Sequence, residues 1–300
     1  MGLLAWLSSR GKRKDEVAAS RLGHAAAARA ANEASERKPG APEPCRYAVN
    51  DVDAAVEWIM GRPDLASERS GVLAFALYHD FHKGRPALKS AVPQAQYDAE
   101  VAACGAPRPE LGDDARGWHV FGADQKDIGE RQELRRIYMN VQPAHACAVV
   151  SHVAARLAAR TSGRGSSTQF QCKIPRSVTG LARTDAAVLC VHAADYADAK
   201  ALVLGYAAEH PEAFVDGTPR FTKPIGRGIA AAPEPTDVGL KWGDNMSYSS
   251  SRAQLVAEAY AKTPATSDPA EKKKAVRAKL AEWEYDAERP WVEPGGQDDL

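Results

Sequence analysis

The sequence predicts an α+β fold with one mostly antiparallel sheet, helices packed on it, and a helical N-terminal part. Short stretches with alternating apolar and polar residues recur in the central part of the chain, and longer stretches with helical spacing lie between and after them. Strand, helix, strand, strand, helix, loop and helix follow one another there, an order that suggests a single sheet with helices on one face.

The first part of the chain predicts helices. Residues 10–38 are rich in Ala, Arg, Lys and Glu and lack Pro, so they form a solvated helix or stay disordered. KPGAPEP (38–44) then breaks the pattern. AVNDVDAAVEWIMG (48–61), with Asn50 or Asp51 as cap, and SERSGVLAFALYHDFHKG (67–84) each read as one amphipathic helix.

The central and C-terminal parts predict four strands and four helices. The predicted strands are GWHVFG (117–122), RRIYMNV (135–141), TQFQCKIP (168–175) and DAAVLCVH (185–192). The predicted helices are PAHACAVVSHVAARLAARTSG (143–163), ADYADAKALVLGYAAEHPEAF (194–214), SYSSSRAQLVAEAYAK (247–262) and a charged surface helix over 267–288.

The remaining segments predict irregular structure. Residues 85–112 are mixed, FTKPIGRGIAAAPEP (221–235) reads as a Gly/Pro loop, and PGGQDDL (294–300) reads as a frayed tail. We expect three parts: an extension over 1–44, a main domain over 45–262, and a charged helix with a tail over 263–300.

The composition describes a globular protein and excludes several classes of function. Hydrophobic residues make up 44% and the formal net charge is zero, so no global field attracts nucleic acid or an acidic membrane. No apolar run is long enough to cross a membrane, and the order of the N-terminal apolar and basic runs is the reverse of a secretory signal. We therefore expect a cytoplasmic protein without nucleic-acid or membrane partners.

The five cysteines indicate neither disulfides nor a metal site. Their number is odd, no CxxC pair occurs, and the sequence shows no metal-ligand spacing. We expect inert buried thiols and no cofactor.

Two of the predicted strands have one apolar and one polar face, because successive side chains of a strand point to opposite sides. The apolar set comprises Ile137, Met139 and Val141 with Phe170, Cys172 and Ile174. The polar set comprises Arg136, Tyr138 and Asn140 with Gln171 and Lys173.

Further cations suggest a pocket for a phosphorylated ligand. Arg183 and Asp185 stand at the entry of a strand, Lys223 and Arg227 lie among glycines, and Arg252 lies in the first turn of the helix over 247–262. The unpaired N–H groups of such a turn attract anions, and arginines bind phosphate in bidentate fashion. The alternative is that these groups form the solvated polar face of an ordinary antiparallel sheet, and the pattern alone leaves both interpretations open.

Several blocks share their order and rough spacing with one family. They are LYHDFHKG, RRIYMNV, FQCKIP, RTDAAVLCV, FTKPIGRGIAAAPEP and SYSSSRAQLVAEAY, and the match covers about residues 55–262. In these blocks the chain resembles the HopA-type family of bacterial effector-like proteins. Members serve as the lyase component of class V lanthipeptide and thioamitide-type biosynthesis, and they are related to OspF-type phosphothreonine lyases.

The resemblance implies β-elimination of phosphate from phosphoserine or phosphothreonine, which leaves dehydroalanine or dehydrobutyrine in a ribosomal precursor peptide. It implies that Lys173 is the base and that Tyr138, where effector lyases carry a histidine acid, donates a proton to the leaving phosphate or holds it. His145 and His192 are weaker substitutes for that acid. The implied phosphate ligands are Arg136, Arg183, Lys223, Arg227 and Arg252, with Asn140 and Asp185 in support.

To act as a base, Lys173 must lose its proton. An unperturbed lysine has a pKa of about 10.4, so only roughly 0.1% is neutral near pH 7.4. We expect neighbouring arginines and partial burial to lower this pKa and enlarge the neutral fraction.

The expected partners are the phosphorylated precursor peptide and a separate Ser/Thr kinase, because no GxGxxG, HRD or DFG pattern occurs in this chain. Two alternatives stay open. One is a non-catalytic phosphopeptide-binding or scaffold subunit of a peptide-modification complex, and the other is an effector that acts on a host phosphoprotein.

Overall fold

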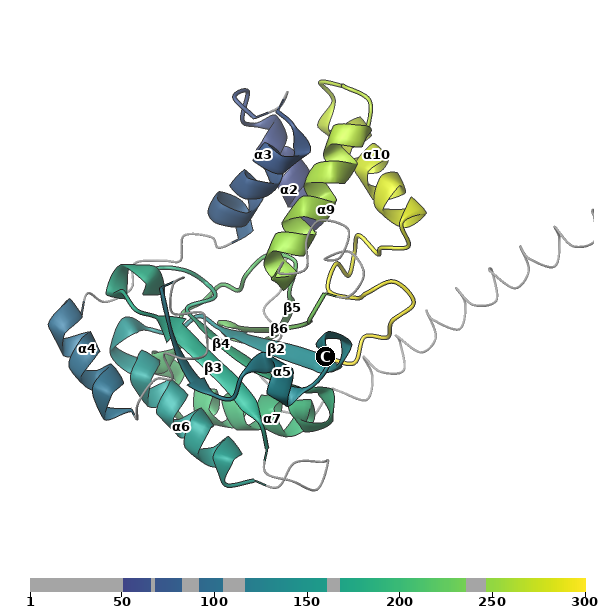
Figure 1. Ribbon diagram of the computed structural model, residues 1–300. Coiled ribbons are helices and arrows are strands. Elements are labelled where there is room, and N and C mark those ends of the chain that lie inside the picture. Colours follow the sequence, from purple (N-terminus) through teal and green to yellow (C-terminus); the bar gives the residue numbers. More distant parts are fainter. Residues whose placement is uncertain (1–50, 66–67, 83–91, 105–116, 161–167, 236–246) are drawn as a thin grey trace, which may run out of the picture. The chain divides into compact units, whose positions relative to one another are not determined.

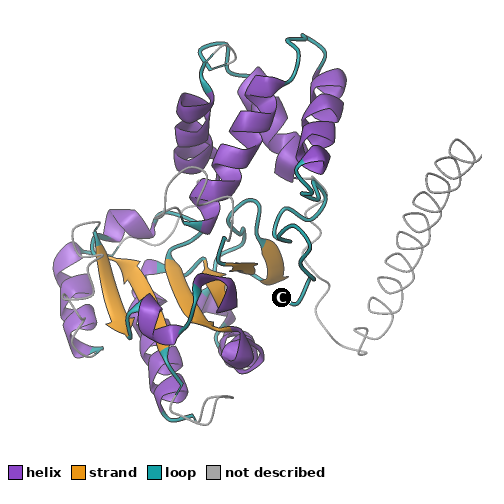
Figure 2. Cartoon of the chain, turned by 45° about the vertical axis from the view of Figure 1, so that its right-hand side comes forward, coloured by secondary structure: helices purple, strands orange, loops and turns teal. Residues whose placement is uncertain are grey.

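A computed structural model of the chain describes residues 51–65, 68–82, 92–104, 117–160, 168–235 and 247–300 (Figures 1 and 2). The predicted extension over 1–44, the candidate cap Asn50 and the predicted helix stop at Gly163 lie outside these residues. Cys45–Leu300 form one compact unit.

A six-stranded antiparallel sheet confirms the predicted α+β class (Figure 1). The strands are β1 (Trp118–Gly122), β2 (Leu134–Met139), β3 (Phe170–Pro175), β4 (Ala187–His192), β5 (Lys223–Gly226) and β6 (Ile229–Pro233). Their order in the sheet is β1-β3-β4-β2-β6-β5. The four predicted strands are thus confirmed. Every pair of adjacent strands in the sheet is antiparallel.

The predicted irregular loop over 221–235 is wrong, because this segment forms the β5–β6 hairpin. The turn requires Gly228, which has φ +65° and whose missing Cβ would lie 2.2 Å from the carbonyl oxygen of Val215. The three alanines of β6, Ala230–Ala232, are buried on both faces of the sheet. Since small residues fit both faces, β6 lacks the alternation that identifies a half-exposed strand.

The predicted assignment of side chains to the two faces of the sheet is confirmed by the strand register. Lys173 pairs with Val188, Val188 with Tyr138, and Tyr138 with Ala230, so these residues form one row across the sheet. Ile137 and Met139 point the other way, into the main apolar core. We call the side that carries Lys173 and Tyr138 the polar face.

Three helices contribute to the main core on the apolar face (Figure 1). They are α4 (Gln94–Ala103), α6 (Ala146–Ala158) and α7 (Ala193–Glu209). The sequence indicated α6 and α7, whereas α4 lay within the segment predicted as mixed. Only Tyr97 and Val101 of α4 are buried. The apolar face of this helix is therefore too narrow to be recognised from the spacing of apolar residues in the sequence.

A second apolar core joins four helices that Figure 2 shows as one group. They are α2 (Asp51–Met60), α3 (Ser70–Ala76), α9 (Tyr248–Lys262) and α10 (Pro269–Glu282). The predicted helix over 67–84 is divided, because α3 is followed by a π-helix, Leu77–His82. Shorter helical turns are α5 (Gln125–Ile128) and the 3₁₀ turns Arg131–Glu133, Pro143–His145, Val178–Leu181 and Pro211–Ala213.

The C-terminal region is more tightly packed than the sequence predicted. Val276 and Leu280 of α10 lie in the second core, so this helix is not purely a surface element. The predicted fraying of 294–300 is wrong, because Leu300 is only 7% exposed and belongs to the main core. We call residues 290–300 the strap.

Candidate functional site

Two of the predicted site residues meet at one aromatic ring on the polar face. The Lys173 Nζ lies 5.2 Å from the ring centroid of Trp118, and the Arg183 Cζ lies 5.0 Å from the same centroid. Trp118 pairs with Pro175 and Val120 pairs with Lys173, so the ring and the amine belong to the same face of the sheet. The electron-rich ring of Trp118 therefore lies within cation–π distance of both side chains.

Arg183 is fixed in place by an ion pair. Its Nε and Nη2 both donate to the carboxylate of Asp185, which is itself buried. Burial would lower the pKa of the Arg183 guanidinium, but Asp185 raises it, so Arg183 is charged at every pH of interest. Tyr78, from the π-helix, also interacts with Arg183. We call Trp118, Lys173, Arg183, Asp185 and Tyr78 the Trp118 cluster.

Tyr138 lies two strands from Lys173, which places their Cα atoms about 10 Å apart. It is 2% exposed, and its hydroxyl makes no hydrogen bond with any residue that the structure describes. Burial raises the pKa of this hydroxyl well above its usual range, although the charge of Arg136 opposes the shift. Tyr138 is therefore a protonated phenol, with Ser249 as a near neighbour.

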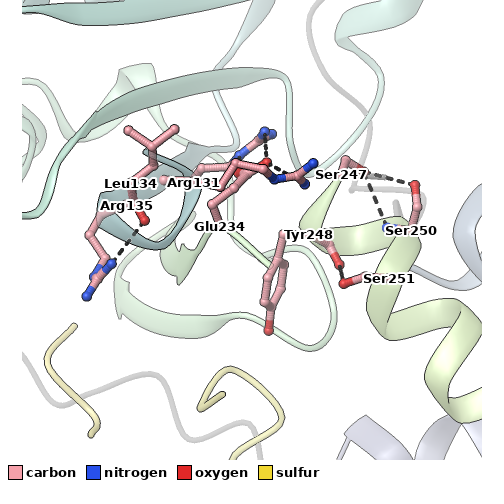
Figure 3. A network of polar contacts seen from close by, with 9 residues as sticks. Arg131, Leu134, Arg135, Glu234, Ser247, Tyr248, Ser250 and Ser251 are labelled. Atoms are coloured by element: carbon pink, nitrogen blue, oxygen red, sulfur yellow. Dashed lines mark hydrogen bonds and ion pairs between the residues drawn. The ribbon is translucent and has the colours of Figure 1, made fainter. Parts of the chain in front are cut away.

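Arg136 shares the polar face but is neutralised by a carboxylate. Its Nε and Nη2 donate to Glu234. Glu234 also accepts from the Nη2 of Arg131 at 3.3 Å (Figure 3). Both Arg136 and Glu234 are buried. The predicted phosphate ligand is thus one half of a buried salt bridge.

Arg252 does not join the Trp118 cluster. It is 1% exposed, its Nε donates to the carbonyl of Pro290 at 2.6 Å, and its Nη2 donates to Glu293. Its Cζ lies 4.7 Å and 5.0 Å from the ring centroids of Tyr248 and Tyr285. Arg252 therefore anchors the strap.

The sequence predicted an anion site at the start of α9. Some of the polar groups there already form hydrogen bonds with residues of the helix itself. The hydroxyl of Ser247 accepts from the backbone N–H of Ser250 at 3.3 Å, and the hydroxyl of Ser251 donates to the carbonyl of Tyr248 at 2.7 Å (Figure 3). The serines cap the helix, as the sequence indicated.

The remaining predicted ligands lie elsewhere. Lys223 pairs with Ala231, which pairs with Ile137, so Lys223 belongs to the apolar side of the sheet and not to the side of Lys173. Arg227, in the β5–β6 turn, donates to Asp216 at 2.8 Å. The side-chain amide of Asn140 donates to the carbonyls of Asp216 and Gly217, both at 3.0 Å, and so holds the segment between the turn Pro211–Ala213 and β5.

The two histidines considered as substitutes for the acid lie at helix starts. The Nδ1 of His192 accepts from the backbone N–H of Ala194 at 3.0 Å and caps α7. His145 is the N-cap residue of α6. Neither is part of the Trp118 cluster.

Sequence reasoning missed three residues of this face. Trp118 was placed on a strand without a role, Tyr78 lies in the LYHDFHKG block, and Glu234 lies in the APEP stretch. The alternation of side chains along the strands could have shown this for Trp118. If β1 and β3 are paired in the observed register, Trp118 and Lys173 lie on the same face of the sheet.

Two kinds of feature are absent from the residues that the structure describes. No group of three or more His, Cys, Asp and Glu side chains there is arranged to hold a metal ion. Within the same residues, no helix is long and apolar enough to cross a membrane.

Comparison with known proteins identifies the family. The model of the HopA1 effector protein family matches residues 116–292, which is more than half of the chain. No curated protein matches the chain.

Two solved structures share the fold. The effector protein from Pseudomonas syringae pv. syringae strain 61 aligns with a TM-score of 0.54 at 15% identity, over 81% of this chain and 96% of that one. The effector protein from Pseudomonas syringae pv. tomato strain DC3000 aligns with a TM-score of 0.52 at 16% identity, over 81% and 98%. The family match and the shared fold agree, and the chain belongs to the HopA1 effector protein family.

Proposed function

We propose that this protein is a phosphoserine/phosphothreonine lyase that acts on a ribosomal precursor peptide after a separate kinase has phosphorylated it. The observation that carries the proposal is the meeting of Lys173 and Arg183 at the ring of Trp118. An amine and a permanently charged guanidinium are held within reach of one substrate, as the elimination of phosphate requires.

The reaction is a β-elimination in which Lys173 is the base. Its neutral amine takes the Cα proton, the electron pair of that C–H bond forms the Cα–Cβ double bond, and the Cβ–O bond breaks with its electrons going to the phosphate. Arg183 stabilises the charge that develops on the departing phosphate. Tyr138 is the candidate proton donor, because burial keeps its hydroxyl protonated.

The roles of the other candidates follow from their contacts. Arg136 and Arg252 are salt-bridged to Glu234 and Glu293, so we assign them to support of the polar face and the strap. We assign the reaction to the cytoplasm, where the kinase supplies the substrate. The proposed lyase domain is residues 45–262, and residues 263–300 contribute α10 and the strap.

The test is mass spectrometry of a phosphorylated precursor peptide incubated with the protein. We expect loss of phosphoric acid, which differs by one water from the loss that a phosphatase causes. Lys173→Ala should abolish the loss. Lys173→Arg should also abolish it, because a guanidinium stays charged and cannot act as a base. Lys126→Ala is the matched control, because that side chain is 77% exposed. Unchanged phosphopeptide with the wild-type protein and its kinase would contradict the proposal.

A second candidate is a non-catalytic phosphopeptide-binding subunit. Burial of Tyr138 beneath Tyr248 and the partly buried Trp291 favours it, because the hydroxyl is not accessible in this arrangement. This function predicts phosphate-dependent binding without elimination, and a Lys173→Ala protein that still works in the complex. The third candidate, an effector on a host phosphoprotein, is favoured by the family itself and would show the same elimination on a host substrate.

A further inference from the structure

The last three residues of the strap, 298–300, contact Lys223 and Arg135 on the side of the sheet opposite Lys173. The Nζ of Lys223 donates to the carboxylate of Asp298 at 3.0 Å and to the main-chain oxygen of Leu300 at 2.6 Å. The Nη2 of Arg135 donates to the carboxylate of Asp299 at 2.6 Å. The chain therefore presents an acidic dipeptide to a lysine and an arginine, with an apolar residue buried beside them.

This surface is separate from the Trp118 cluster. Lys223 lies in the same row as Ile137, and Arg135 is two residues from Ile137 on the same strand. Both cations therefore project to the apolar side, where Tyr196 of α7 belongs to the core that also contains Leu300. A ligand bound here would not occupy the Lys173 side of the sheet.

The surface around Lys223 and Arg135 has hydrogen-bond donors that residues 298–300 do not use. The hydroxyl of Tyr196 is buried, with 5% of the residue exposed, and makes no hydrogen bond among the described residues. It interacts electrostatically with Asp298, Asp299 and Arg135. The Nε of Arg135 is also buried and lacks a partner there. A carboxylate offers two oxygen atoms, whereas a phosphorylated side chain offers three.

The end of the strap is also held less firmly than its beginning. The side chain of Asp299 is 50% exposed and those of Asp298 and Lys223 are 23% and 27% exposed, so water and salt weaken both ion pairs. At the beginning, Arg252 and Glu293 are 1% and 12% exposed. Residues 298–300 can therefore dissociate from Lys223 and Arg135 while the strap stays anchored at Glu293.

We propose that Lys223, Arg135 and Tyr196 form a binding site for an acidic peptide segment, and that residues 298–300 are its internal occupant. The site lies on the other side of the sheet from the proposed lyase centre and needs no elimination chemistry. A segment with phosphoserine in the position of Asp299 binds more tightly than the acidic one, because the phosphoryl oxygens accept from the donors that Asp299 leaves unused.

The test uses the full chain and a fluorescent peptide with the sequence of residues 293–300, Glu-Pro-Gly-Gly-Gln-Asp-Asp-Leu. Replacement of both aspartates in the chain (Asp298→Asn, Asp299→Asn) weakens the internal competitor. Fluorescence anisotropy should then show at least about tenfold tighter peptide binding than to the unchanged protein, since about 1.4 kcal/mol of lost competition is a factor of ten. The phosphoserine peptide should bind more tightly again.

Two comparisons make the result decisive. Adding Lys223→Gln to the double variant should remove the gain, whereas adding Lys126→Gln, on an exposed side chain, should not. A peptide with asparagines in place of both aspartates should bind neither protein. Equal binding of the two peptides, no effect of Lys223→Gln, or no advantage of phosphoserine would overturn the proposal.

A second measurement needs no variant. Hydrogen exchange of the backbone amides of residues 298–300 in the unchanged protein should become faster as the acidic peptide is added in excess. Unchanged exchange would overturn the proposal even if the double variant failed to fold. Because both readouts report binding at Lys223, their failure leaves the proposed elimination at Lys173 untouched.

Discussion

Replacement of Glu234 by glutamine distinguishes a structural Arg136 from a phosphate-binding one. Both nitrogen atoms of Arg136 that bond Glu234 are buried with it, so the substitution leaves a charge in the sheet without a counter-charge. Breaking one side of such a pair costs about 3–5 kcal/mol. Arg131 does not compensate, because it adds a further positive charge to the same place.

The expected loss is large enough to measure by thermal unfolding. For a protein of this size each kcal/mol lowers Tm by about 2–4 °C, so Glu234→Gln should lower it by about 6–20 °C. The double variant Arg136→Met, Glu234→Leu removes both charges and should recover most of this loss, because apolar residues of similar volume often replace a buried pair at little cost.

A phosphate-binding role for Arg136 predicts a different result for Glu234→Gln. If Arg136 were a phosphate ligand, Glu234→Gln would expose its charge to phosphate, and added inorganic phosphate would raise the Tm of the variant by mass action. A loss of less than about 1 kcal/mol, the value of an exposed pair, together with such a rise, would refute the structural role assigned to Arg136.

Three further predictions concern other positions. Trp118→Ala removes the ring shared by Lys173 and Arg183 and should slow phosphopeptide turnover about 100-fold, with Trp118→Phe recovering part of the rate. Lys272→Met removes the buried amine that donates to three carbonyls at the end of α9 and just after it; urea unfolding should show a loss of about 1–3 kcal/mol, and Lys274→Met little change. Gly228→Ala should destabilise the hairpin by more than about 1–2 kcal/mol, because φ is positive there and the added Cβ meets a carbonyl; an unchanged Tm would contradict this.

The sequence was most informative where the two faces of a strand differ in polarity. The alternation in RRIYMNV and FQCKIP predicted correctly which side chains enter the core, because one face of each strand packs on helices. It failed for β6, where alanine suits both faces, and for the strap, where glycine and aspartate are typical of a solvated tail. In both cases tertiary contacts overrode local composition.

The candidate site was harder to predict because charge compensation is not visible locally. Arg136 and Glu234 are separated by 98 positions, Arg252 and Glu293 by 41, and Lys223 and Asp298 by 75. A count of cations therefore does not show which of them already have a carboxylate partner. Arg183 differs from these three because its partner, Asp185, is two positions away in the sequence.

The proposed elimination would change the charge balance at the Trp118 cluster during the reaction. Arg183 and Asp185 together carry no net charge, so a neutral Lys173 leaves little to attract a phosphate dianion in the ground state. In the proposed reaction, proton transfer from Cα would change this, because Lys173 would become an ammonium as negative charge builds on the leaving oxygen. The cation would then form during the step that needs it, and an interaction that strengthens toward the transition state accelerates a reaction where an equally strong ground-state contact would not.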